Sequence, residues 1–129
     1  MSIDEITAGA LPRPAGHYSH ATRAGGLVFV AGLLPVASDG RALGAEPFEV
    51  QVAQVLANLD EVLAAAGTSR AALVQVRVYI TDVARWGDFN RLYAAWIGDR
   101  RPARCVVPVP VLHHGVLLEV EAIAAAAGG

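Results

Sequence analysis

Two glutamates lie two positions apart near the C-terminal end of the chain, in the otherwise apolar run Leu118-Glu119-Val120-Glu121-Ala122-Ile123-Ala124. Side chains at positions i and i+2 of a β-strand point to the same face, so we expect the two carboxylates side by side. Like charges at that distance favour the protonated form unless a cation or hydrogen-bond donors compensate. A carboxyl group that keeps its proton near neutral pH can act as an acid–base catalyst. The alternative is a solvated face on which both acids meet water.

A second candidate group is Arg104, in the segment Arg100-Arg101-Pro102-Ala103-Arg104-Cys105. A guanidinium can bind a carboxylate through two parallel hydrogen bonds, so an arginine at the mouth of a strand can hold an amino or keto acid. We also predict that Arg104, on a strand next to the paired glutamates, compensates their charge. The alternative is a surface salt bridge, a role that suits Arg100 and Arg101 better because they follow a helix end.

Cysteine and histidine give weaker signals. Cys105 lies in an extended, valine-rich segment with no base nearby in the sequence, so we do not expect a nucleophilic thiol. His17 and His20, like His113 and His114, lack an HExxH-like spacing, and no Cys/His cluster has zinc-ligand spacing. We therefore expect structural or solvated histidines and no metal.

Length and composition limit the class of protein. A chain of 129 residues predicts one domain over residues 1–129. Hydrophobic residues make up 54% of the chain and charged residues 17%, which is more apolar surface than a small monomer hides and favours an oligomer. All ten basic residues are arginine and the net charge is −2, which counts against nucleic acid as the main ligand.

The same sequence predicts a cytoplasmic protein. Its first ten residues carry two acids and no base, unlike a targeting peptide, and no apolar run reaches the length of about 20 residues that a membrane helix needs. The single cysteine cannot form an internal disulfide, which is typical of a reducing compartment.

The predicted secondary structure shows which elements position these groups. Residues 1–16 are small, contain proline and have no period, and we interpret them as an arm laid over the domain. Strands are predicted over 18–22 and 27–31. The dipeptide Gly25-Gly26 between them is typical of a hairpin turn.

Residues 47–66 have a helical period instead, with Pro47 in the first turn and Gly67 as a C-terminal cap. The stripe expected to face the core consists of Phe48, Val52, Val55, Leu59, Val62 and Leu63. Residues 73–81 then alternate, which predicts a half-buried strand. We expect one face to consist of Val74, Val76, Val78 and Ile80, and the other of Gln75, Arg77 and Tyr79.

A second helix is predicted over about 84–97, capped by Asp82. Its apolar side consists of Trp86, Phe89, Leu92, Tyr93 and Trp96. Strands follow over 104–109 and 115–125, the latter with the apolar face Val116, Leu118, Val120, Ala122 and Ala124. The order β-β-α-β-α-β-β predicts an α+β domain in which a mixed sheet carries both helices on one face. The other face can then pack in a symmetric oligomer.

Five segments, taken together, resemble one protein family. They are Gly16-His17-Tyr18-Ser19, Val28-Phe29-Val30-Ala31-Gly32-Leu33-Leu34-Pro35, Asn58-Leu59, Asp88-Phe89-Asn90 with Tyr93, and Arg101-Pro102-Ala103-Arg104 followed by Leu118-Glu119-Val120-Glu121-Ala122-Ile123-Ala124. The last pair is the most specific, and the match runs from about residue 14 to residue 125. The chain resembles the reactive intermediate deaminase family (Rid, RidA or YjgF-type), also described as L-PSP endoribonuclease.

The resemblance implies a chorismate-mutase-like fold and a homotrimeric barrel with active sites at the subunit interfaces. It implies a hydrolase of the 2-iminobutanoate/2-iminopropanoate deaminase type, which converts enamines and imines of amino-acid metabolism to 2-keto acids and ammonia without a cofactor. Arg104 would hold the substrate carboxylate, and Glu119 would hold and activate the attacking water. The pocket would be lined by Tyr18, Ala31, Gly32, Asn90 and Val106.

Two positions depart from the pattern of the well-studied deaminases. Ala31 stands where many carry a serine, and Val106 stands where many carry a cysteine. Cys105 is one position early, so on a strand it would face the other way. Both changes make the pocket wall more apolar, and we expect a larger or more apolar substrate side chain.

Three alternatives stay open at this point. One is a non-catalytic, regulatory trimer that binds small carboxylates, and another is a pathway-specific deaminase, aminomuconate-like or biosynthetic. The third is the ribonuclease of the older family label, which the net charge of −2 and the absence of lysine count against.

Overall fold

The computed structural model describes residues 1–128; Gly129, the last residue of the single domain predicted over 1–129, lies outside the described residues. The strands are β1 (Asp4–Ile6), β2 (Ala21–Ala24), β3 (Leu27–Leu33), β4 (Leu73–Ile80), β5 (Ala103–Pro108) and β6 (Leu118–Ala125). The helices are α1 (Phe48–Ala65) and α2 (Trp86–Ile97), with short 3₁₀ turns η1 (Arg70–Ala72), η2 (Val83–Arg85) and η3 (His113–Gly115).

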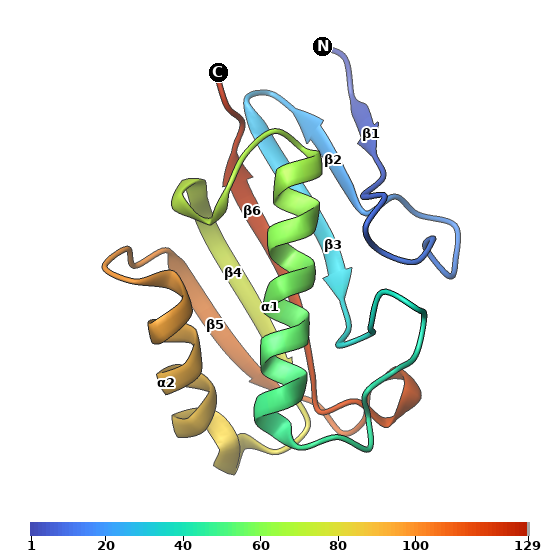
Figure 1. Ribbon diagram of the computed structural model, residues 1–129. Helices are drawn as coiled ribbons and strands as arrows, with labels where there is room; N and C mark the ends of the chain where they lie inside the picture. The colour runs from blue at the N-terminus through green and yellow to red at the C-terminus, as the bar shows by residue number, and fades with distance from the viewer. Residues whose placement is uncertain (129) are drawn as a thin grey trace.

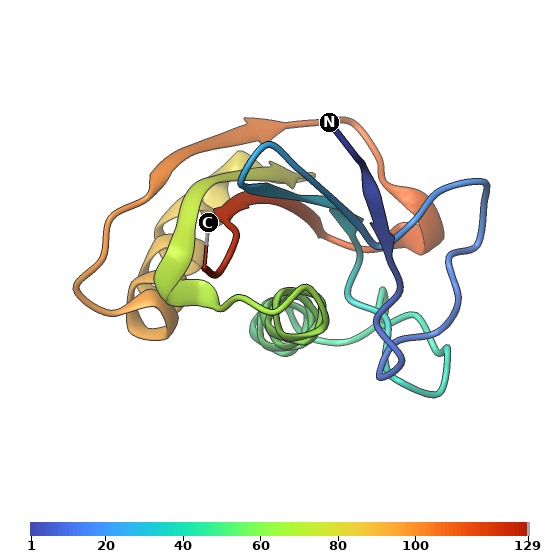
Figure 2. The ribbon, with the colours of Figure 1, turned by 90° about the horizontal axis from the view of Figure 1, so that it is seen from above.

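All the strands form one mixed sheet in the order β1-β2-β3-β6-β4-β5. The pair β4–β5 is parallel and the other pairs are antiparallel. Both helices lie on the same side of the curved sheet, as the views in Figure 1 and Figure 2 show. The predicted α+β arrangement is therefore confirmed. Among the described residues, no helix is long and apolar enough to cross a membrane.

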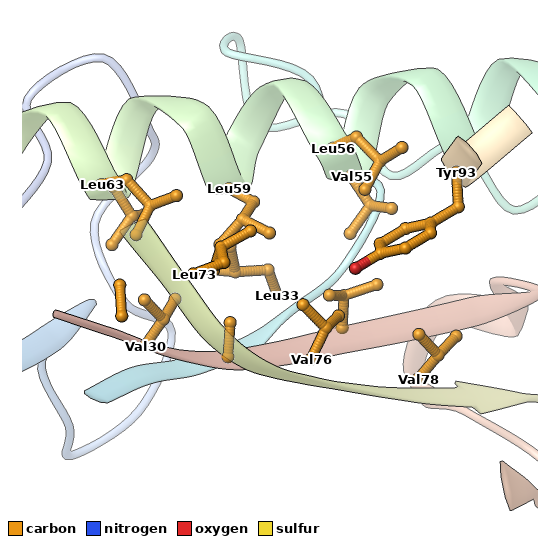
Figure 3. Close-up of a cluster of buried hydrophobic side chains, with 14 of the residues drawn as sticks. Val30, Leu33, Val55, Leu56, Leu59, Leu63, Leu73, Val76, Val78 and Tyr93 are labelled. Atoms are coloured by element: carbon orange, nitrogen blue, oxygen red, sulfur yellow. The ribbon is translucent and has the colours of Figure 1, made fainter. Parts of the chain in front are cut away.

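The core lies between this sheet face and the helices. Every residue of the stripe predicted for α1 is buried, and the stripe packs on β3, β4 and Tyr93 of α2 (Figure 3). Gly67 has φ +77°, and the amide of Thr68 donates to the carbonyl of Leu63 at 2.9 Å, so the predicted glycine cap is confirmed.

The N-terminal region differs from its prediction in two ways. Part of the supposedly aperiodic arm is β1, which pairs with β2 and adds a strand to the predicted order. Tyr18 lies in a bend before β2, which begins only at Ala21. The three residues of β1 are too few to show an alternating pattern in the sequence. Their strand conformation depends on pairing with the edge of β2.

Val74 is the clearest error in the predicted strand faces. A register shift between Leu73 and Gln75 in the pairing of β4 with β6 breaks the alternation. Leu73 is fully buried as a result, whereas the Val74 side chain is 47% exposed.

The predicted cap of the second helix is also displaced. The carboxylate of Asp82 accepts a hydrogen bond from the amide of Ala84 at 3.0 Å, and so caps η2 rather than α2. On the apolar side of α2, Phe89 and Tyr93 are buried, but Trp86 is 45% exposed.

Candidate active site

Glu119 lies against the bare backbone of Gly32. Val30 pairs with Ala122 and Leu33 pairs with Val120, so β3 has one residue more than β6 here and bulges. A Cβ atom at position 32 would be 2.1 Å from Oε2 of Glu119. Only glycine therefore leaves room for this carboxylate.

The Glu119 carboxyl opens on a groove of about 880 Å³, which we call the Glu119 groove. Its walls come from the N-terminal arm, β3, the loop after β3, α1 and η3. Its lining residues include Leu11–Gly16, Tyr18, His20, Ala31, Gly32, Leu33, Leu34, Val36, Asn58, His113, His114 and Glu119. Burial raises the pKa of the Glu119 carboxyl, while the charge of His113 lowers that pKa and Glu121 raises it. No protein group hydrogen-bonds to this carboxylate within residues 1–128.

Glu121, on the same face of β6, has partners of its own. The hydroxyl of Tyr79 donates to Oε1 of Glu121, and Arg77 lies 3.8 Å from the same oxygen. The hydrogen bond to Glu121 and burial raise the pKa of Tyr79. The two neighbouring carboxylates thus have different environments, which is the arrangement that assigns different roles to paired acids.

Arg104 is not the cation that compensates the glutamates, so that prediction was wrong. β5 is an edge strand, and within residues 1–128 it pairs with β4 alone, which separates it from β6. The strand next to Glu121 instead supplies Arg77. Sequence order places β5 directly before β6, but the sheet inserts β4 between them.

Aromatic rings of α2 surround Arg104. Its Nη2 donates to Oδ1 of Asn90 at 3.0 Å, and its Cζ lies 5.0 Å from the ring centre of Tyr93. The rings of Trp86 and Phe89 are 5.6 Å and 5.7 Å away. No carboxylate forms an ion pair with Arg104 in the described part of the chain. Arg104 is therefore a positioned cation that remains available to an anion.

Arg104 and Glu119 lie on opposite faces of the sheet. Arg104 is aligned with Val76 of β4, which is buried beneath the helices, whereas Glu119 is aligned with Tyr79. Positions 76 and 79 are an odd number apart, so their side chains point to opposite faces. A single chain therefore does not bring the two predicted catalytic groups together.

The other residues predicted to line the site lie either in the Glu119 groove or near Arg104. Tyr18, Ala31 and Gly32 line the Glu119 groove, with the Tyr18 side chain 53% exposed. Val106 is aligned with Val78, on the face to which Arg104 points, and Asn90 contacts Arg104 directly. We call Arg104, Asn90 and Val106 the Arg104 cluster.

Asn58 is a groove residue to which the sequence analysis assigned no role. Its Nδ2 donates to the carbonyls of Leu34 and Val36, at 3.1 Å and 2.9 Å, and so shapes the loop after β3. The available signal was an amide within the apolar stripe of a helix.

The described residues contain no group of three or more His, Cys, Asp or Glu side chains that could hold a metal ion.

Comparisons with known proteins identify the family of this chain. A family model described as Endoribonuclease L-PSP matches residues 8–126. A RutC family protein of Pyrococcus horikoshii is 38% identical over 113 residues, which cover 88% of this chain and 90% of the relative.

Two solved structures are similar along almost their whole length. One is YyfA of Yersinia pestis, described as a member of the conserved Rid protein family, with a TM-score of 0.91, 34% identity and coverage of 96% of this chain and 99% of that one. The other is E. coli TdcF with bound serine, with a TM-score of 0.88, 28% identity and coverage of 95% and 98%. This chain therefore belongs to the Endoribonuclease L-PSP family, the family of the Rid and RutC proteins.

Proposed function

We propose that this protein is an enamine/imine deaminase that hydrolyses 2-aminoacrylate-type intermediates to 2-keto acids and ammonia. The observation that carries the proposal is the Glu119 carboxyl, which faces a groove over Gly32, has no protein hydrogen-bond partner within residues 1–128, and has a raised pKa. Such a group can take a proton from water and return it to nitrogen near neutral pH.

The proposed reaction starts from the imine tautomer, which is electrophilic at carbon. Glu119 accepts a proton from a water molecule as the water oxygen bonds to the imine carbon. That proton passes to the nitrogen and gives a neutral carbinolamine. The hydroxyl proton of this intermediate is then transferred through Glu119 to the amine nitrogen, the carbon–nitrogen bond breaks with its electron pair leaving on ammonia, and the carbonyl of the 2-keto acid forms. Orientation of the substrate relative to this water supplies much of the rate enhancement.

A second copy of the chain completes the site in our proposal. Arg104 and Glu119 point to opposite faces of one sheet, so the carboxylate held by Arg104 and the water held by Glu119 meet only across an interface. A homotrimeric barrel, with the open sheet faces inside and the helices outside, supplies three such interfaces. The open face includes Phe29 and Val107, which are 41% and 38% exposed in one chain.

We propose substrates with a larger or more apolar side chain than the simplest iminoacids. Ala31 lines the Glu119 groove, and Val106 lies beside Arg104 in β5, so both departures from the family pattern are apolar. Leu33, Leu34 and Val36 add further apolar groove wall. A hydrocarbon side chain on the substrate would gain about 0.8 kcal/mol for each methylene that it buries there.

A second candidate function is binding of small carboxylates without turnover. The bound serine of TdcF favours it, because serine carries the carboxylate that Arg104 would hold. As further proposals, we expect a cytoplasmic location and no nucleic-acid ligand, since the net charge of −2 gives no basic surplus for phosphates.

The test is a coupled assay in which threonine dehydratase or an amino-acid oxidase generates the imine and 2-keto acid formation is timed. We expect wild type to accelerate hydrolysis, and Arg104→Ala to lower kcat/KM by about 100-fold or more. Glu119→Gln should abolish turnover while retaining the side-chain shape. Matched controls are Arg91→Ala, an exposed arginine of α2, and Glu61→Gln, an exposed glutamate of α1.

Failure of wild type to exceed the buffer rate, with binding of keto acids still lost in Arg104→Ala, would support the binding protein instead. Sedimentation velocity tests the assembly separately. A monomer at assay concentrations that is active would contradict a site shared between copies.

A further inference from the structure

His20 is a buried histidine, 4% exposed, with no part in the proposed reaction. It lies just before β2 and contacts the N-terminal arm (residues 1–16), whose Leu11–Gly16 segment forms one wall of the Glu119 groove. Its backbone carbonyl accepts a hydrogen bond from the amide of Ala31 at 3.0 Å. His20 thus connects the arm to the part of β3 that carries Ala31 and Gly32.

The two ring nitrogens of His20 have different hydrogen-bond partners, and each partner fixes whether its nitrogen carries a hydrogen. The amide of Ala8 donates to Nδ1 at 2.9 Å, so Nδ1 must be free of hydrogen. Nε2 lies 3.1 Å from the carbonyl of Pro12, which can only accept, so Nε2 must carry the proton. The neutral ring protonated on Nε2 is the one form that satisfies both contacts.

We propose that His20 is a positioning residue that holds the arm as a wall of the Glu119 groove only while its ring is neutral, so that protonation of His20 releases the arm and opens the groove. A second proton, on Nδ1, would point at the amide hydrogen of Ala8. Both groups would then be donors, and the Nδ1–H of the buried cation would lack an acceptor. Histidine is the side chain that ordinarily changes charge between about pH 5 and 8.

Several ionisable groups share the Glu119 groove with His20. Arg13 and Tyr18 share the groove with it, as do His113 and His114 from η3 and Glu119 from β6. A second cavity, which shares Gly16 and Tyr18 with the groove, is also lined by Glu5 and His17.

The test uses NMR on the full-length, isotope-labelled protein and needs no substrate. Long-range imidazole spectra report the tautomer and protonation of His20, and hydrogen exchange reports the protection factors of the Ala8 and Val28 amides. We expect the Nε2-protonated tautomer at neutral pH. As His20 gains a proton, the protection factor of the Ala8 amide should fall by about tenfold or more, while the protection factor of the Val28 amide in β3 should not change.

Two variants separate the ring from its neighbours. His20→Gln should make the protection factor of Ala8 independent of pH, because an amide does not titrate in this range. His17→Gln, a change at an exposed neighbour, should behave as wild type.

Three outcomes would overturn the proposal. The first is an Ala8 amide that stays protected after His20 has gained its proton. The second is loss of protection at Val28 together with Ala8, since His20 would then support the whole fold rather than the arm. The third is the wild-type pH dependence of Ala8 persisting in His20→Gln. If that variant does not fold, the wild-type titration alone still decides, and none of these results depends on whether the protein is a deaminase.

Discussion

The Glu119 carboxylate occupies the space that a side chain at Gly32 would fill, because a Cβ atom there would be 2.1 Å from Oε2. We predict that Gly32→Ala moves this carboxylate and lowers kcat/KM by about 100-fold, which is the expected cost of misplacing a catalytic group by about 1 Å. Stability should change little, since the atom that must move is the free end of a side chain. Assay kinetics and thermal unfolding measure the two effects. Unchanged kcat/KM would argue against a role for Glu119 in turnover.

Asn90 holds the Arg104 guanidinium through one hydrogen bond of 3.0 Å. We predict that Asn90→Ala raises KM by about tenfold with a smaller effect on kcat, because a hydrogen bond to a charged group is lost and the guanidinium is less well oriented. Arg91→Ala, one position along the same helix, is the control. An equal loss in both variants would indicate general damage to α2 rather than loss of the contact with Arg104.

Glu119 also predicts a pH dependence of stability. Because burial raises its pKa in the folded state, the folded protein binds more protons than the unfolded chain between the ordinary and the raised value. Stability from this group is therefore present at low pH and is lost as pH rises through that window. Glu119→Gln should therefore gain stability relative to wild type as the pH rises above the ordinary glutamate pKa of about 4.3. Urea unfolding at several pH values tests this, and a gain that instead grows towards low pH would contradict it.

Tyr93 carries a buried hydroxyl with no hydrogen-bond partner among the described residues. Its ring contacts Arg104, and burial raises the pKa of the hydroxyl. We predict that Tyr93→Phe leaves the free energy of unfolding unchanged or raises it by up to about 1 kcal/mol, because the ring is retained and an unpaired polar group is removed. Urea denaturation measures the difference. A clear loss of stability would mean that the hydroxyl has a partner, such as an ordered water.

Local pattern was enough to predict the helices and the strand that carries Glu119. The stripe of α1 and the apolar face of β6, Leu118 to Ala124, are buried as expected, because 3.6-residue and two-residue periods follow from backbone geometry alone. The strand predicted over 115–125 begins only at Leu118, since Gly115 belongs to η3, although Val116 is buried as well. Cys105 is exposed and aligned with Arg77, on the face opposite to Arg104, as the same alternation predicts.

Other predictions depended on contacts between distant parts of the chain. The bulge at Leu73–Gln75 exposes Val74, and the bulge opposite Glu121 places Gly32 beneath Glu119. Both irregularities arise in the pairing with β6, which is distant in sequence from β3 and β4. β1 forms only because β2 offers it an edge. The tautomer of His20 follows from backbone groups eight and twelve positions away.

The sequence by itself thus determined which residues carry the chemistry and which elements they belong to, since composition, period and spacing are properties of neighbouring residues. Only the tertiary structure decided where those elements go. The insertion of β4 between β5 and β6 gave Glu121 the partner Arg77. The register of β5 and β6 against β4 placed Arg104 and Glu119 on opposite faces of the sheet. Strand order is decided by the packing of the whole core, in which each strand must cover apolar surface that is distant in sequence.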